Sequence, residues 1–195
     1  MSKRVILVTG TPCVGKTSVS RLLASKLNAE YVNLTDLAIR EGLISGKDKE
    51  RDSIIVDENK MRKKLHELID SSNKKDIVID GHYAVSVVPK NLVTYIFVLR
   101  RDPVELKKLM QSSGFTDRKL WENLASEILD VCLVDALNVH SEEKVCELDN
   151  SGKSVEEIVS EILTVLERHK KCGVGLVDWL GKLESEGVLD DYLKI

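Results

Sequence analysis

The sequence predicts an α/β protein in which helices cover both faces of a five-stranded parallel sheet, giving three layers. Short β-rich runs alternate with helical patterns along the chain, which is typical of parallel strands joined by crossover helices. The strand-like runs are largely apolar, as expected for strands that are buried on both faces. The 195 residues, of which 43% are apolar and 31% charged, fit one globular domain with room for a core.

Each element in the first half of the chain follows from a local pattern. Residues 4–9 form an apolar run that predicts the first strand. After a glycine-rich turn, a helix is expected over residues 16–27, because its valine and leucines recur on one face. The remaining elements of this half are a strand at 31–34, the start of a short helix at 36–40, a polar excursion at 42–56, a helix at 57–69 and a strand at 76–80.

The second half continues the alternation. Apolar runs predict the fourth strand at 94–99 and the fifth at 144–148. Ser154 and Glu157 have the Ser-x-x-Glu spacing of a capping box, so a helix is expected from there to about residue 169. The other expected elements are a helix from 103 to about 110, a small break at 112–115, a long helix over 117–139 and an amphipathic helical piece after Gly173.

Charge and hydropathy exclude several classes of protein. With 29 basic and 32 acidic residues the net charge is −3, so neither a general basic surface for nucleic acid nor direct DNA binding is expected. No apolar run reaches the roughly 18 to 20 residues of a membrane helix. The N-terminal residues also lack the pattern of a signal peptide. A cytoplasmic protein without membrane contact is therefore expected.

The cysteines predict neither a zinc site nor a disulfide framework. They form no Cys-x-x-Cys pair and have no histidine at metal-ligand spacing. Reduced thiols, as in a cytosolic protein, are therefore expected for Cys13, Cys132, Cys146 and Cys172.

A phosphate-binding loop follows the first strand. The pattern G-x-x-x-x-G-K-[ST] is satisfied at every required position, by Gly10-Thr11-Pro12-Cys13-Val14-Gly15-Lys16-Thr17. Glycine lets successive backbone N–H groups turn toward phosphate oxygens, and the helix N-terminus adds its dipole. Lys16 brings a charge to the β- and γ-phosphates, Thr17 offers a hydroxyl to Mg²⁺, and Ser18 can reach a phosphate oxygen. This strand–loop–helix unit predicts a P-loop nucleoside triphosphatase fold.

Among proteins with such a loop, the small nucleoside-phosphate kinases fit best. The Asn-Lys-x-Asp motif that reads guanine in GTPases is missing, and the chain is too short for a large ATPase motor. Such kinases carry one excursion that closes over the acceptor monophosphate and a lid that closes over the donor. Residues 33–56 and 112–122 match these two in position and size. A kinase for another small acceptor, such as CMP, dephospho-CoA or shikimate, is an alternative.

Taken together, the motifs resemble the adenylate kinase isoenzyme six family. The resemblance runs from about Val5 to Leu166 and rests on the phosphate loop together with Asn33-x-x-Asp36-Leu37-Ala38, Phe97-Val98-Leu99-Arg100, Gly114-Phe115, Lys119-Leu120 and Asn123-x-x-x-Glu127-Ile128. It implies a nucleoside monophosphate kinase-like enzyme that uses Mg²⁺ and ATP to phosphorylate AMP or a related monophosphate, and that also hydrolyses ATP. It also implies an alternative role in ribosome biogenesis. In that role an ATPase supports rRNA processing of the small subunit through a small-subunit ribosomal protein.

The resemblance also assigns roles to individual residues. Lys16, Asp80, His82 and Arg118 are implied to be catalytic, with His82 placed to orient water or the acceptor. Mg²⁺ would be held by Thr17 and Asp80, partly through water. The implied ATP-binding residues are Cys13, Val14, Gly15, Lys16, Thr17, Ser18, Ser113 and Lys153, and the implied monophosphate-binding residues are Asp36 and Arg40.

Three positions depart from the family pattern. Cys13 stands where glycine is usual, Ser113 where the lid has an arginine, and Ile39 where the acceptor site has one. Charge stabilisation of the transferring phosphoryl group, the main catalytic device in this chemistry, then falls to Arg100, Arg101 or Arg118.

The resemblance ends before the C-terminus. Residues 1–172 are expected to form the kinase core and 173–195 a helical extension, whose apolar stripe consists of Leu176, Val177, Trp179, Leu180 and Leu183. A helix this short is marginal alone in water, so the stripe must be buried. It can pack on the protein's own sheet-flanking helices. Alternatively it can bind a second copy or a ribosomal partner, for which an exposed Trp179 would suit as an anchor.

Overall fold

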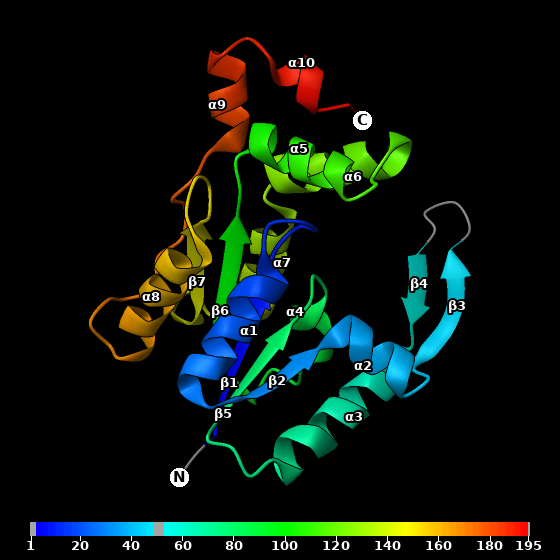
Figure 1. The fold of residues 1–195 in the computed structure, drawn as a ribbon, viewed down its shortest axis with the longest axis vertical. Coiled ribbons are helices and arrows are strands. Elements are labelled where there is room, and N and C mark those ends of the chain that lie inside the picture. The colour runs from blue at the N-terminus through cyan, green and yellow to red at the C-terminus, as the bar shows by residue number, and fades with distance from the viewer. Residues whose placement is uncertain (1–2, 49–52, 195) are drawn as a thin grey trace.

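A five-stranded parallel sheet forms the centre of the protein in the computed structural model, which describes residues 3–48 and 53–194 (Figure 1). The strand order is β2-β5-β1-β6-β7, so the first strand lies in the middle. The bounds are β1 Arg4–Thr9, β2 Glu30–Asn33, β5 Asp76–Asp80, β6 Val93–Arg100 and β7 Val145–Asp149. The predicted three-layer α/β fold is confirmed.

Two hydrophobic cores, one on each face of the sheet, hold the layers together. Alternate residues of β1 enter different cores: Val5 and Leu7 belong to one, Ile6 and Val8 to the other. This period of two is what a fully buried strand produces. The first core is covered by α2 Leu34–Arg40, α3 Glu58–Ser71, α4 Ala84–Val87 and α7 Val131–Val139, and the second by α1 Lys16–Leu27, α5 Pro103–Ser112, α6 Asp117–Ile128 and α8 Val155–Leu166.

The excursion after β2 carries a β-hairpin that the sequence pattern did not predict. Strands β3 Ile44–Asp48 and β4 Ser53–Val56 pair antiparallel and project from the body of the protein beside α2 and α3 (Figure 1). Ile44 and Ile55 stay exposed on it. The mixed polar and apolar residues here lack the continuous apolar run by which the buried strands were recognised.

The long helix expected over 117–139 is two helices, so that prediction is wrong. α6 ends at Ile128, and α7 starts after Asp130, which adopts a left-handed backbone conformation with φ 58°. The guanidinium of Arg100 donates a hydrogen bond of 2.9 Å to the backbone carbonyl oxygen of Glu127 and also binds the Asp130 carboxylate. The hydrogen bond from Arg100 to a carbonyl oxygen of the last turn, together with the left-handed residue Asp130, ends α6 there. The spacing of apolar residues cannot reveal this end.

The C-terminal segment packs on the protein itself. After a short 3-10 turn at Glu142–Lys144, β7 and α8, the chain forms α9 Trp179–Ser185 and α10 Leu189–Tyr192, which lie against α5 and α6 (Figure 1). Only 7% of Trp179 is exposed, so it is no surface anchor, whereas Leu176 is 59% exposed. The capping box predicted at Ser154 and Glu157 is present. The stripe is therefore buried at Trp179 and Leu183, whereas Leu176 and Leu180 remain exposed.

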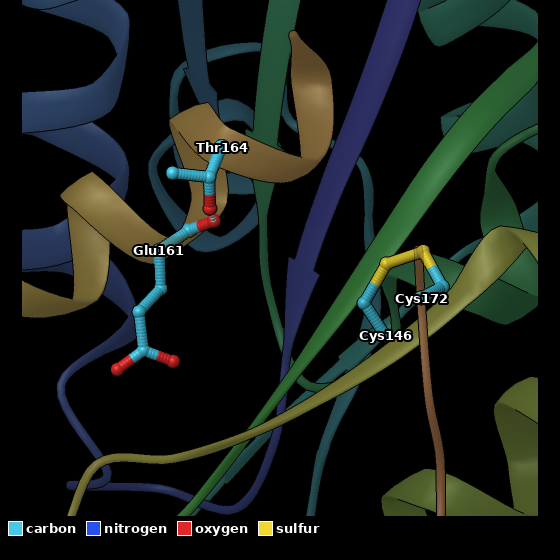
Figure 2. Close-up of a disulfide and its surroundings, with 4 residues drawn as sticks. All are labelled: Cys146, Glu161, Thr164 and Cys172. Carbon is cyan, nitrogen blue, oxygen red and sulfur yellow. Dashed lines mark hydrogen bonds between the residues drawn. A yellow bond between two sulfur atoms is a disulfide. The ribbon is translucent and has the colours of Figure 1, made fainter. Parts of the chain in front are cut away.

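A disulfide corrects the prediction of four reduced thiols. Cys146 in β7 is bonded to Cys172, in the stretch that follows α8, across a sequence separation of 26 residues (Figure 2). Cys13 and Cys132 are free thiols. No spacing motif announces a bond between a strand and a distant loop, so the pairing depends on the fold. Within the described residues, no helix combines the length and the apolar character needed to cross a membrane.

Candidate active site

The phosphate loop lies at the carboxyl end of β1, in the middle of the sheet. Gly10, Cys13 and Gly15 all have left-handed backbone conformations, with φ of 134°, 68° and 105°. A Cβ atom at Gly10 would collide with the carbonyl oxygen of Leu99, so only glycine fits there. Cys13 takes a conformation that glycine would adopt more readily, which explains why the resemblance expects glycine at this position.

Lys16 begins α1 and points back over the loop. Its Nζ donates a 2.8 Å hydrogen bond to the carbonyl oxygen of Thr11. Burial lowers the pKa of Lys16, while the carboxylates of Asp80 and Glu127 favour its charged form. Thr17 and Ser18 follow in the first turn and are exposed, so their hydroxyls are accessible to a ligand at the helix N-terminus.

Two buried side chains from distant parts of the chain fix the loop, and sequence reasoning assigned neither a role. Glu127 in α6 accepts a 2.6 Å hydrogen bond from the hydroxyl of Thr11. Asn150, directly after β7, donates a 2.5 Å hydrogen bond to the carbonyl oxygen of Val14. A polar residue directly after a buried strand was the available signal for Asn150. The loop is thus held in shape from outside its own motif.

Asp80 ends β5 beside the loop and is fully buried. It accepts hydrogen bonds from Asn33 Nδ2 at 2.6 Å and from the Tyr31 hydroxyl at 3.2 Å, and it lies in register with Val8 of β1. Burial raises the pKa of Asp80, although hydrogen bonds, the largest from Thr17, counteract it. The adjacent Thr17 hydroxyl and Asp80 carboxylate are hard oxygen donors, which suits them to hold Mg²⁺, directly or through water.

His82 follows two residues after Asp80. The backbone carbonyl of His82 accepts a 3.2 Å hydrogen bond from the hydroxyl of Thr9, which ties this turn to the end of β1. Desolvation of the ring and the charge of Lys16 lower the pKa of His82 to about 4, even though part of the residue is exposed. A neutral imidazole beside Lys16 can accept or donate one hydrogen bond, as a group that orients water or an acceptor must.

Arg100 does not face the phosphate loop, which removes one of the three candidate arginines. Its side chain is 2% exposed and binds Glu127 at 2.9 Å, Glu147 at 2.6 Å and the carboxylate of Asp130. All three nitrogens of its guanidinium group donate into this cluster, so it fastens β6 to α6 and β7. The expectation that Arg100 could stabilise the transferring phosphoryl group is therefore wrong, and its role is structural.

The other candidate cations for the donor side lie on α5, α6 and the loop after β7. Arg101 is near the start of α5 and pairs with Glu105 at 3.4 Å, and Arg118 pairs with Glu122 at 2.6 Å on α6. Lys153 pairs with Glu161 of α8 at 2.8 Å. Ser113 caps the end of α5 and is exposed.

The acceptor-side residues lie on one exposed helix. Asp36 is in the first turn of α2, where its backbone N–H donates to the side chain of Asn33 at 2.9 Å. Arg40 is in the last turn, and its side chain is 66% exposed and pairs with Glu41 at 3.3 Å. Ile39, where the resemblance expects an arginine, is 60% exposed. The structure thus places Asp36 and Arg40 on α2, whose N-cap Asn33 is hydrogen-bonded to Asp80.

A phosphate loop with its lysine, beside a buried aspartate at the carboxyl edge of a parallel sheet, defines a P-loop kinase. Residues 6–130 match the family model described as "AAA domain", and the chain belongs to this family. It is 37% identical over 177 residues to a protein of Methanocaldococcus jannaschii named "Putative adenylate kinase", covering 91% of this chain and 93% of that one. A protein of the same name from Thermococcus kodakarensis is 43% identical over 176 residues, covering 90% and 92%.

Solved structures of other kinases share the fold. The shikimate kinase of Acinetobacter baumannii, in complex with shikimate, superposes with a TM-score of 0.60 at 15% identity, covering 87% of this chain and 96% of that one. The shikimate kinase of Bacteroides thetaiotaomicron gives a TM-score of 0.57 at 17% identity, covering 84% and 98%. At such identities the likeness concerns the fold, and the acceptor has to be argued from the site.

Proposed function

We propose that the protein is a nucleoside monophosphate kinase that converts ATP and AMP into two ADP and also hydrolyses ATP slowly. The observation that carries this is the hydrogen bond of 2.6 Å between Asn33 and Asp80. Asn33 is also the N-cap of α2, the helix that carries the proposed acceptor residues. Its side chain therefore connects Asp80, the carboxylate proposed to hold Mg²⁺, to the acceptor excursion. The relatives named as adenylate kinases support the same reading.

The donor nucleotide would be held by the phosphate loop. Backbone N–H groups from Cys13 to Ser18 and the charge of Lys16 would surround its β- and γ-phosphates. Mg²⁺, held by Thr17 and Asp80, would neutralise charge that develops on the transferred group. Ser113 and Lys153 would contact the rest of the ATP molecule, with Lys153 near the base.

The acceptor would bind on the α2 side. Arg40 would pair with its phosphate and Asp36 would hold the nearby polar groups, while His82 orients the attacking oxygen. With Arg100 committed to its buried cluster, Arg101 and Arg118 are left to stabilise the transferring phosphoryl group. AMP is the acceptor that the relatives' name favours over CMP, dephospho-CoA or shikimate.

The experiment is to measure ADP formed from Mg²⁺ and ATP with AMP, CMP, dephospho-CoA, shikimate or no acceptor. AMP should raise ADP production at least tenfold above the acceptor-free rate. An equal rate with and without every acceptor would exclude a kinase and leave an ATPase.

The ATPase outcome corresponds to a second candidate function, an assembly factor in small-subunit rRNA maturation. The acceptor side favours it to a degree, because Ile39 is exposed where an arginine is expected, and Ile44 and Ile55 are exposed apolar residues on the neighbouring hairpin. Such residues suit contact with a protein partner, such as a small-subunit ribosomal protein. Here ATP hydrolysis would be stimulated by that partner and not by AMP. The narrower resemblance to isoenzyme six stays a prediction.

A further inference from the structure

A chain of hydrogen bonds runs from the C-terminal helix α9 to the phosphate loop through one carboxylate. Trp179 Nε1 donates to Glu127 Oε1 at 3.1 Å, and the Thr11 hydroxyl donates to Glu127 Oε2 at 2.6 Å. The carbonyl oxygen of Thr11 in turn accepts from Lys16 Nζ at 2.8 Å. Thr11 and Glu127 are each 1% exposed and Trp179 is 7% exposed, so water cannot substitute for these partners.

We propose that Glu127 is a positioning residue for the donor nucleotide and that the C-terminal segment, residues 173–194, acts on the phosphate loop through it. This inference rests on the proposed function only in taking the loop to bind ATP. Glu127 itself does not touch the nucleotide. It acts by fixing the position of Thr11. Thr11 belongs to the loop backbone that supplies the N–H groups, and its carbonyl oxygen accepts the hydrogen bond from Lys16.

The carboxylate of Glu127 is suited to transmit position. Its Oε1 atom accepts from Arg100 Nε at 2.9 Å, from the backbone N–H of Arg101 at 3.1 Å and from Trp179, whereas Oε2 has Thr11. A buried carboxylate that lacks part of its donors is costly, so it moves toward those that remain. Removal of the Trp179 donor therefore shifts the carboxylate relative to Thr11.

Several contacts keep Trp179 in place. Lys182 binds the carboxylate of Asp102, the N-cap of α5, and Lys107 of α5 lies 4.6 Å from the ring centre of Tyr192. Upstream, the backbone N–H of Leu176 donates to Glu147 at 2.6 Å. The segment is therefore held both by β7 and by α5, beside the proposed lid. It lies outside residues 6–130, which match the family model.

Trp179→Phe tests the inference, because it replaces the indole by a smaller aromatic ring that has no N–H donor. The dissociation constant of Mg·ATP, measured by titration calorimetry, should rise about fivefold, because only part of the free energy of a hydrogen bond to a charged group is passed on to the nucleotide. The KM for ATP should rise with it, while the KM for AMP stays unchanged. Leu180→Ala is the matched control on the same helix, since Leu180 is 39% exposed, and it should leave ATP binding as in the wild type.

A double-mutant cycle separates positioning from general stabilisation. Thr11→Val removes the other end of the link, and if both residues act through Glu127, the effects of Thr11→Val and Trp179→Phe on ATP binding should not add. Additive effects, or wild-type ATP affinity in Trp179→Phe, would overturn the inference. Should Trp179→Phe not fold, Lys182→Met loosens the segment without touching Glu127. It should weaken ATP binding about twofold, and unchanged affinity would overturn the inference as well.

The readout also separates this inference from the proposed function. If the wild-type protein binds Mg·ATP but does not phosphorylate AMP, the proposed kinase activity is wrong. The role of Glu127 can then still be tested by the same measurements of ATP binding. A kinase whose Trp179→Phe variant binds ATP normally would contradict the link alone.

Discussion

The donor side and the acceptor side of the site are built in opposite ways. The phosphate loop is fixed by buried side chains from other elements, among them Glu127 and Asn150, and Arg100 holds Glu127 in turn. On the acceptor side, Asp36 and Arg40 are exposed on α2, and Arg40 pairs with its exposed neighbour Glu41. One side is therefore complete before the substrate arrives, and the other exposes its binding groups to water.

This difference follows from what each side has to do. Phosphoryl transfer depends on charges and dipoles that are already oriented, because they then need no reorganisation during the reaction. An acceptor has to enter and leave, so its binding groups must be accessible. Substitutions on the donor side should consequently cost stability or rate, and those on the acceptor side only affinity for the acceptor.

The largest effect is expected at Arg100. Arg100→Met leaves Glu127 and Glu147 buried without their main cation, which should lower the free energy of unfolding by about 3 to 5 kcal/mol. Urea denaturation measures it. Arg40→Met on the acceptor side is the matched control and should change stability by less than about 0.5 kcal/mol. Equal losses of stability in Arg100→Met and Arg40→Met would contradict the difference between the donor side and the acceptor side.

Lys16→Ala should act on rate and leave the fold intact. Its Nζ is bonded to the loop carbonyl of Thr11 and not to a core element, so the melting temperature should stay near the wild-type value. Loss of a preorganised charge at the transferring phosphates typically lowers kcat by about 10² to 10³. ADP formation under saturating ATP and AMP gives the measurement. Hydrolysis of ATP at the parental rate would show that the site is misassigned.

Arg40→Ala should weaken the acceptor alone. One charged hydrogen bond to the monophosphate corresponds to about a tenfold rise in the KM for AMP, with the KM for ATP unchanged. Lys64 is a useful control, because it also pairs with Glu41, at 2.7 Å, and Lys64→Ala should leave both constants unchanged. If Arg40→Ala changes the KM for ATP equally, the two sides are not independent.

The same contrast explains how much could be predicted from the sequence. The phosphate loop is a local motif in which Gly10, Gly15 and Lys16 each have a chemical requirement, so its position and conformation follow directly. The sheet strands were predicted because they are buried on both faces and therefore apolar. Asp80 was recognisable as an acid at the end of such a strand.

What could not be predicted depends on contacts between distant residues. Arg100 was one of three arginines considered for the phosphoryl group, because its burial is visible only once Glu127 and Glu147 converge on it. The break at Asp130 has the same origin, because Arg100 captures the end of α6. The bond between Cys146 and Cys172 likewise depends on where the chain runs after α8.

The smallest effect is expected at Cys13, where the donor side retains some strain. Its φ of 68° costs a residue other than glycine about 1 to 2 kcal/mol. Glycine relieves this but costs roughly 0.5 to 1 kcal/mol in conformational entropy. Cys13→Gly should therefore stabilise the protein by roughly 0.5 to 1 kcal/mol in urea denaturation, and ATP affinity should be unchanged or higher because the site uses only the backbone N–H of this residue.

Two further measurements make the Cys13 prediction specific to the loop. Asn28→Gly replaces another left-handed residue, with φ 48°, at the opposite end of α1, and it should leave ATP binding unchanged. Bound Mg·ATP should also slow alkylation of the wild-type Cys13 thiol, followed by mass spectrometry of the peptide that contains it. Weaker ATP binding in Cys13→Gly, or equal labelling of Cys13 with and without Mg·ATP, would show that the loop does not enclose the phosphates as the donor side of this comparison requires.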